Sequence, residues 1–145
     1  MADYLTQFSC HLDLGSPETA ARALILLEEL RDGAEDGDDD AIYGFEAGAD
    51  PQHPGTLYFT DDAGQGDPEH LIRFVLGCAE AFDLKGRWGF TWSLSCPRHR
   101  LDGFGGGAQL LDLSERKSLA WTDCAHWLLT MLDPETDPDA GVAFA

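Results

Sequence analysis

The sequence predicts an α+β domain: a ferredoxin-like antiparallel sheet in the order βαββαβ with both helices on one face, followed by a C-terminal ββα extension. Two observations predict this class. A helix-start signal, consisting of a capping residue, proline and glutamate, begins at Ser16 and again at Asp67, 51 positions later. Segments in which apolar and polar residues alternate lie before, between and after the two helices. The 145 residues, 43% of them hydrophobic, suffice for one core.

The first strand and the first helix follow each other directly. Residues 4–14 alternate, with the larger side chains on one face: Tyr4, Thr6, Phe8, Cys10, Leu12 and Leu14. This pattern predicts a half-buried strand. Ser16 is the expected N-cap and Pro17 the first helical residue, and apolar residues at helical spacing continue the helix to about Asp32. Gly33 is expected to end the helix.

A hairpin and a second helix come next. Residues 41–47 and 56–60 are predicted strands, joined by a loop that contains proline, glycine and histidine. Asp67 then repeats the helix-start signal before Pro68. The second helix is expected to bury one stripe of side chains: Leu71, Phe74, Val75, Cys78 and Phe82.

The clearest strand of the chain covers residues 88–94. All of its bulky side chains lie on one face: Trp88, Phe90, Trp92 and Leu94. Two short strands are predicted after it, at residues 108–113 and 119–121, and a helix at residues 123–132 that stops before Pro134.

These elements divide the chain into two parts. We expect one ferredoxin-like domain with its extension over residues 1–132, and a mobile acidic tail over residues 133–145.

The face of the predicted sheet that lies opposite the helices is polar and small. It carries Gln7, Ser9, His11, Gly89, Thr91, Ser93 and Ser95. RNA-binding sheets of this architecture stack bases on aromatic side chains at this face and surround them with basic groups. These strands supply neither, so the face fits the docking of a protein better than the binding of RNA.

The charge of the chain is strongly negative and unevenly distributed. The 27 acidic and 9 basic residues give a net charge of −18, so the chain repels nucleic acid and anionic membranes and is not expected to bind either directly. Residues 1–83 carry 19 acidic and 3 basic side chains, whereas residues 84–117 carry 3 acidic and 6 basic. Adaptation to solubility or to high salt is an alternative explanation of the acidity, although a uniform adaptation does not require this segregation.

An acidic loop precedes the predicted hairpin. It contains Glu35, Asp36, Asp38, Asp39 and Asp40. The loop begins like a calcium-binding loop, but Ala41 stands where that loop needs glycine and Ala47 where it needs glutamate, so at most a weak, non-specific cation site is expected. We expect these carboxylates, together with Asp61 and Asp62, to form the main contact with a basic protein partner.

Two further patterns are weak candidates for a site. Residues 103–108 match the dinucleotide fingerprint G-x-G-x-x-G/A, but they precede a strand and not a helix, which favours a flexible turn or bulge. Cys96, His99, Cys124 and His126 offer zinc ligands without the spacing of a zinc finger. We therefore expect no zinc, no cofactor and reduced cysteines in the core, and the sequence shows no signature of a catalytic triad.

Several motifs between residues 67 and 129 carry a resemblance. They are Trp88-Gly89-Phe90-x-Trp92, Cys96, Phe104-Gly105-Gly106-Gly107-Ala108, Asp112-Leu113, Trp121 and His126-Trp127-Leu128. In these motifs the chain resembles a group of small uncharacterised proteins of phages and other bacterial mobile elements, and the resemblance implies no activity. In size and acidity alone the chain is similar to phage-encoded inhibitors, including anti-CRISPR proteins and DNA mimics that place carboxylates where a DNA-binding enzyme expects phosphates.

The resulting hypothesis is a non-enzymatic binding protein, encoded by a phage or mobile element, that blocks an electropositive nucleic-acid-binding surface of a host defence complex. The alternative is a small ligand-binding module or enzyme that uses the Gly103–Gly107 turn and nearby tryptophan, arginine and histidine side chains. The sequence begins without the basic and apolar segments of a signal peptide, so the expected location is the cytoplasm.

Overall fold

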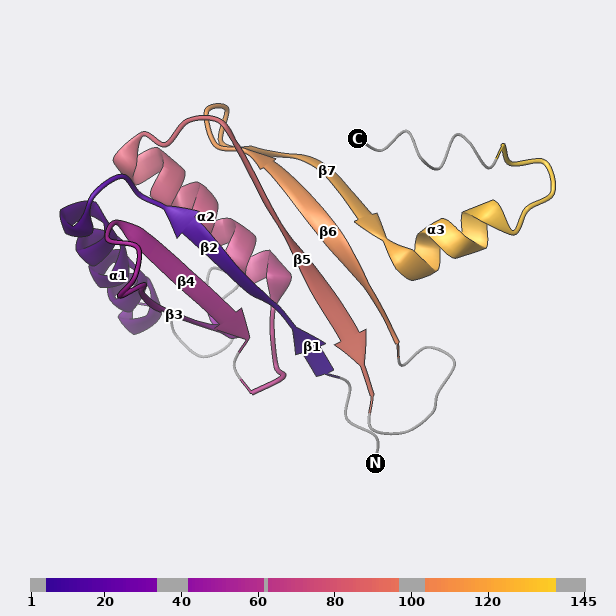
Figure 1. Ribbon diagram of the computed structural model, residues 1–145, viewed down its shortest axis with the longest axis horizontal. Coiled ribbons are helices and arrows are strands. Elements are labelled where there is room, and N and C mark those ends of the chain that lie inside the picture. Colours follow the sequence, from indigo (N-terminus) through magenta and orange to yellow (C-terminus); the bar gives the residue numbers. More distant parts are fainter. Residues whose placement is uncertain (1–4, 34–41, 62, 97–103, 138–145) are drawn as a thin grey trace.

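The computed structural model describes residues 5–33, 42–61, 63–96 and 104–137 and has three helices and two antiparallel sheets (Figure 1). This confirms the predicted α+β class. The elements, in chain order, are β1 (Leu5–Gln7), β2 (Ser9–Asp13), α1 (Pro17–Asp32), β3 (Phe45–Ala49), β4 (Thr56–Asp61), α2 (Pro68–Phe82), β5 (Arg87–Ser95), β6 (Gly105–Asp112), β7 (Lys117–Asp123) and α3 (Cys124–Met131). Among the described helices, none has the length and apolar character needed to span a membrane.

The strands form two sheets, in the orders β1-β5-β6-β7 and β2-β4-β3. The strand predicted over residues 4–14 is divided at Phe8: β1 pairs with the end of β5, and β2 pairs with β4. The predicted single ferredoxin-like sheet is therefore not confirmed in that form.

The division at Phe8 has a physical cause in the contacts of this residue. Its side chain is buried and lies edge-to-face against Phe90, with 5.8 Å between the ring centroids. Its backbone N–H donates to the Oδ1 atom of Asp61 over 3.1 Å, and its carbonyl oxygen accepts from the backbone N–H of Asp61, also over 3.1 Å. Asp61 thus satisfies the backbone of Phe8 at the point where the chain passes from one sheet to the other.

Both predicted helix starts are confirmed. The Ser16 hydroxyl accepts a hydrogen bond from the backbone N–H of Thr19 at the start of α1. The Asp67 carboxylate accepts from the N–H groups of Glu69 and His70 at the start of α2. These caps satisfy N–H groups that have no partner within the helix.

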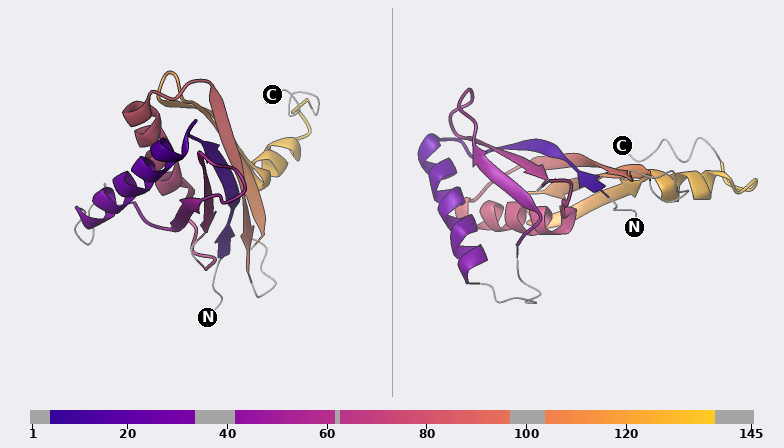
Figure 2. Two further views of the ribbon diagram at one scale, coloured as in Figure 1. Left: turned by 60° about the vertical axis from the view of Figure 1, so that its left-hand side comes forward. Right: turned by 90° about the horizontal axis from the view of Figure 1, so that it is seen from below.

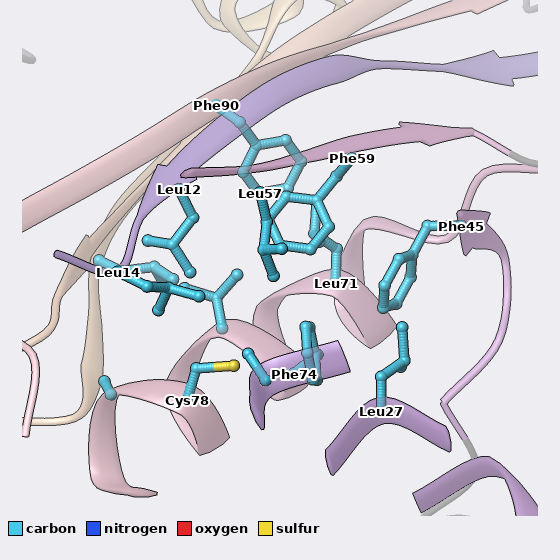
Figure 3. Close-up of a cluster of buried hydrophobic side chains, with 14 of the residues drawn as sticks. Leu12, Leu14, Leu27, Phe45, Leu57, Phe59, Leu71, Phe74, Cys78 and Phe90 are labelled. Carbon is cyan, nitrogen blue, oxygen red and sulfur yellow. The ribbon is translucent and has the colours of Figure 1, made fainter. Parts of the chain in front are cut away.

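The main core lies between the β2-β4-β3 sheet and the helices α1 and α2 (Figure 3). Phe45, Phe59 and Phe74 form its centre, with ring centroids 5.8 to 6.0 Å apart. Four residues of the predicted α2 stripe are buried, Leu71, Phe74, Val75 and Cys78, while Phe82 is half-buried. The helical periodicity of the sequence therefore identified the buried face of α2.

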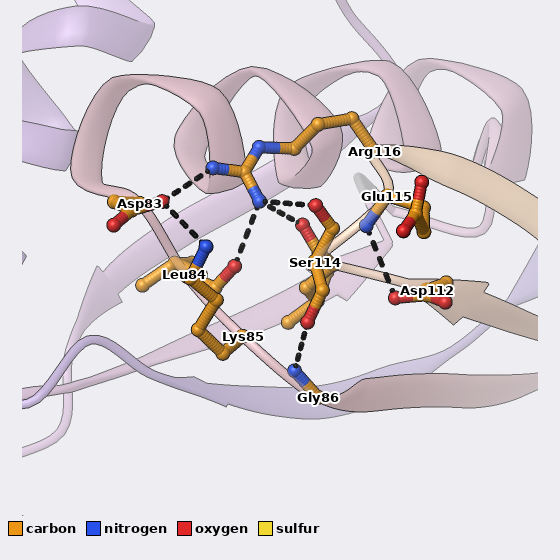
Figure 4. A network of polar contacts seen from close by, with 9 residues as sticks. Asp83, Leu84, Lys85, Gly86, Asp112, Ser114, Glu115 and Arg116 are labelled. Atoms are coloured by element: carbon orange, nitrogen blue, oxygen red, sulfur yellow. Dashed lines mark hydrogen bonds and ion pairs between the residues drawn. The ribbon is translucent and has the colours of Figure 1, made fainter.

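The strands β6 and β7 and the helix α3 extend away from this core (Figures 1 and 2). Arg116 lies in the turn between β6 and β7, and it connects this turn to the residues that follow α2 (Figure 4). Its guanidinium donates to the carbonyl oxygens of Leu84, Leu113 and Ser114 and to the carboxylate of Asp83. No side chain of α3 is buried.

Candidate functional site

Of the predicted partner-binding residues, the structure describes Asp61 alone. The others, Glu35, Asp36, Asp38, Asp39, Asp40 and Asp62, lie outside the described residues. The chain on either side of the acidic loop is described, up to Gly33 and from Ile42 onward.

Arg31 links these two ends. From the last turn of α1 its guanidinium donates to the carbonyl oxygens of Ile42, over 2.9 Å, and of Phe45, over 2.5 Å. The same guanidinium lies 5.0 Å from the centre of the Phe45 ring, a cation–π contact. The hydroxyl of Tyr43 donates back to the carbonyl oxygen of Arg31. This role of Arg31 could not be predicted from the sequence, because its acceptors are backbone carbonyl oxygens, which every residue carries.

The segment 42–45, which follows the acidic loop, brings further carboxylates beside it. Phe45 is paired with Asp61 in the β3–β4 register, so Asp61 lies next to the returning end of the loop. The backbone N–H of Asp67 donates to the carbonyl oxygen of Gly44 over 3.0 Å. We define the acidic end as Asp61 and Asp67, which lie beside this segment, together with Asp32 and Glu46, which flank the acidic loop in the sequence.

Both carboxylate oxygens of Asp61 accept hydrogen bonds from backbone N–H groups. Its Oδ1 atom accepts from Phe8 and its Oδ2 atom accepts from the backbone N–H of Gly64 over 2.7 Å. The side chain therefore fixes the crossing between the sheets and the turn before α2, in addition to contributing negative charge. The sequence indicated the charge of Asp61 and not this structural role.

A polar hollow of about 360 Å³ adjoins the acidic end. In it the Nδ1 atom of His70 accepts from the backbone N–H of Tyr43 over 2.9 Å, and the Nε2 atom lies 3.4 Å from a carboxylate oxygen of Asp67. The other oxygen of Asp67 caps α2. Both side chains are thus engaged in holding Tyr43 and the helix start, which explains their proximity without a catalytic role.

The glycine run has a different structure from the predicted turn. Gly105, Gly106 and Gly107 form the start of β6, and Gly103 lies outside the described residues. A Cβ atom on Gly107 would overlap the carbonyl oxygen of Thr122 and the ring of Trp92. Glycine is therefore required here for the close approach of the strands, whereas the irregularity of the β6–β7 pairing lies further along, between Leu110 and Leu111. A strand follows the run, whereas a dinucleotide fingerprint requires a helix.

The four proposed zinc ligands do not share one environment. Cys96 is buried and Cys124 is exposed, and His99 lies outside the described residues. Within the part of the chain that the structure describes, no three residues of the metal-binding types come together. The expected absence of zinc remains a prediction for elemental analysis.

The cysteines differ in their surroundings. Burial raises the pKa of the Cys10 and Cys78 thiols to about 12, because the charged thiolate loses its hydration. Cys124, at the first position of α3, is exposed, contrary to the expectation of core thiols only.

The structure also reveals an apolar surface that the sequence analysis missed. Its large side chains, with their exposed fractions, are Trp121 (62%), Trp127 (40%), Leu128 (51%), Leu129 (71%) and Leu132 (65%). We define these residues as the apolar end. The signal was present in the sequence: Ala125, Leu128, Leu129 and Leu132 form a helical stripe, and no described element covers it.

A shallow hollow of about 370 Å³ lies on the outer side of β5, β6 and β7. Its lining residues are Gly89, Phe90, Thr91, Ala108, Gln109, Leu110, Ala120, Trp121 and Thr122. None of these side chains ionises near neutral pH. The hollow therefore supplies no acid, base or strong nucleophile for the enzyme alternative.

Comparison with family models, with curated proteins and with solved structures gives no match for this chain.

Proposed function

We propose that the protein is a non-enzymatic binding protein whose acidic end occupies an electropositive surface of a protein partner. The observation that carries this proposal is the placement of the segment that follows the acidic loop: Gly44 and Phe45 lie beside Asp67 and Asp61, and Arg31 joins this segment to the end of α1. In this proposal the five carboxylates of residues 35–40 act together with those of the acidic end.

The physical basis is the summed field of these charges. One exposed ion pair contributes about 0 to 1 kcal/mol, whereas a cluster of like charges attracts an oppositely charged surface from a distance and raises the association rate. Surfaces that bind nucleic acid are basic, so they are the natural class of partner for this end.

The proposed partner is part of a host defence complex. The resemblance to small proteins of phages and mobile elements, and the acidity shared with anti-CRISPR inhibitors, support an inhibitor that blocks a nucleic-acid-binding surface of a host defence complex. Such a complex acts in the cytoplasm, which is the proposed location.

For the fold, we infer a ferredoxin-like relationship between the two sheets. The pairing of β2 with β4, of β4 with β3 and of β1 with β5 supports it, if β1 and β2 are regarded as one strand interrupted at Phe8. An experimental structure in which residues 5–13 form one continuous strand between β4 and β5 would support this relationship.

The experiment is a pull-down of the tagged protein from host lysate at low and high salt, followed by affinity measurements with the purified partner. The test variant replaces Asp36, Asp38, Asp39 and Asp40 by asparagine. We expect much weaker binding, a shallower dependence on salt, and displacement of DNA from the partner by the unmodified protein only.

The chain offers a matched control with the same loss of four charges. It replaces Asp133, Asp137 and Asp139 by asparagine and Glu135 by glutamine in the tail. The proposal predicts near-normal affinity for this control. Equal affinity and equal salt dependence of the loop variant and the unmodified protein would contradict it, provided that the melting temperature is unchanged.

A further inference from the structure

The apolar end contains a helix with an exposed apolar face. The stripe Ala125, Leu128, Leu129 and Leu132 faces away from the molecule, since Trp127 and Met131 line the hollow between α3 and β7 instead. The helix has only eight residues, and isolated helices of this length are unstable in water without packing.

A groove lies next to this helix. It has a volume of about 570 Å³ and lies between the first turns of α2 and the strands β5, β6 and β7. Ile72, Trp92, Leu94 and Trp121 supply its apolar walls. Trp121 also lines the hollow beneath α3, so the groove and the exposed helix adjoin each other.

We propose that the occupant of this groove is α3 of a second copy of the chain, in a symmetric dimer. Each copy offers one protruding apolar helix and one apolar groove at the same end. A two-fold axis near Trp121 therefore lets both helices be covered in one reciprocal interface.

The charge distribution favours a second copy at this end. Residues 84–132 carry six basic and four acidic side chains, whereas residues 1–83 carry 19 acidic and 3 basic. Contact through residues 84–132, with a net charge of +2, brings fewer like charges together than contact through residues 1–83, with a net charge of −16, although Glu69 lines the groove and Asp133 follows Leu132.

The exposed area is close to what a dimer needs. Two tryptophans and three leucines with these exposed fractions present on the order of 600 Å², against about 800 Å² per partner in a standard stable interface. The walls of the groove add apolar area to this surface.

The contact is made by side chains and not by pairing of edge strands. β7 is the last strand of its sheet, and its pairing with β6 is irregular between Leu110 and Leu111. Such an irregularity, together with the charged Lys117 at the start of β7, opposes the addition of another strand at this edge.

The experiment measures the mass of the full chain by analytical ultracentrifugation over a range of concentrations. We expect a concentration-dependent mass that approaches twice 15.8 kDa. The variant Leu129→Glu places a charge in the stripe and is expected to weaken self-association at least about tenfold. The control Ile25→Glu introduces the same charge at an exposed apolar residue of α1 and leaves self-association nearly unchanged.

A second measurement does not depend on a variant. Amide hydrogen exchange in α3 is expected to slow as the protein concentration rises, because the helix is stabilised only in the dimer. A single-chain mass at all concentrations would overturn the proposal, as would self-association that Leu129→Glu leaves intact or exchange in α3 that is independent of concentration. The loop variant leaves the residues of the apolar end unchanged and acts on self-association only through the repulsion between copies, so failure of this proposal and failure of the proposed function are distinguishable.

Discussion

The half of the molecule that contains α1, α2 and the β2-β4-β3 sheet buries its large apolar side chains, whereas β7 and α3 leave theirs exposed. Both halves follow regular apolar periodicity in the sequence. The difference lies in the number of covering elements: two helices pack on the first sheet, and no described element covers the outer face of α3. An exposed apolar stripe of regular spacing therefore indicates where a partner is missing.

The two halves also differ in charge. The proposed partner of the acidic end is attracted through many weak, long-range interactions, whereas the large exposed side chains of the apolar end carry no charge. The four predictions that follow test this contrast, beginning with the largest expected effect.

The first prediction concerns thiol reactivity in the two halves. With a pKa of about 12 instead of 9.0, Cys78 holds about 1000-fold less thiolate than an ordinary thiol. Iodoacetamide at pH 8 is expected to label Cys124 first and to spare Cys78 in the folded chain. Mass spectrometry of peptides over time measures both rates, and labelling of Cys78 as fast as Cys124 would show that the core is more open than described.

The second prediction compares two aromatic truncations. Phe74→Ala removes the ring that contacts Phe45 and Phe59 in the core, and it is expected to cost about 3 to 5 kcal/mol of unfolding free energy. Trp121→Ala is expected to cost less than about 1 kcal/mol in the monomer, because the side chain is largely exposed. Urea unfolding of both variants at low protein concentration provides the values. Equal losses of unfolding free energy would contradict the difference in side-chain burial between the two halves.

The third prediction uses two glycines. Gly107→Ala is expected to destabilise by about 1 to 3 kcal/mol, because the new methyl group meets Thr122 and Trp92. Gly77→Ala in α2 is the matched control: nothing lies within 4 Å of its Cβ position, and alanine favours the helix by about 0.5 to 1 kcal/mol. Thermal unfolding should therefore move in opposite directions for these variants. A neutral Gly107→Ala would mean that β7 is not packed closely on β6.

The fourth and smallest effect concerns pH. Lys85, with Arg116 as the second partner, holds the pKa of Asp83 below its ordinary value. Asp83 therefore contributes stability above its unfolded pKa, and this contribution is lost as the pH falls through the lower folded pKa. The carboxyl resonance of Asp83 in an NMR titration should show this low pKa, and Arg116→Ala should raise it toward the ordinary value. An unchanged titration of Asp83 in Arg116→Ala would show that Arg116 does not lower the pKa of Asp83.

Local signals in the sequence were sufficient for most elements and for the buried face of α2. Ser16 and Asp67 identified both helix starts because capping is a local interaction between neighbouring residues. The division of the first strand could not be predicted, since it depends on hydrogen bonds between Phe8 and Asp61, 53 residues apart. The exposure of α3 was missed for a related reason: its stripe is typical of a buried face, and only the arrangement of the other elements shows that nothing described covers it.

The most direct test of the contrast between the two ends is the salt dependence of self-association. Added salt screens the repulsion between acidic ends, with a screening length that falls from about 10 Å at 0.1 M to about 3 Å at 1 M, and it does not weaken apolar contacts. Sedimentation equilibrium should therefore show that the dimer of the unmodified chain becomes tighter as salt rises. At low salt, the variant with Asp36, Asp38, Asp39 and Asp40 replaced by asparagine should form a tighter dimer than the unmodified chain. The opposite result is a dimer that weakens with salt or that is lost in this loop variant. It would contradict the claim that the acidic end binds through charge and the apolar end through buried apolar area.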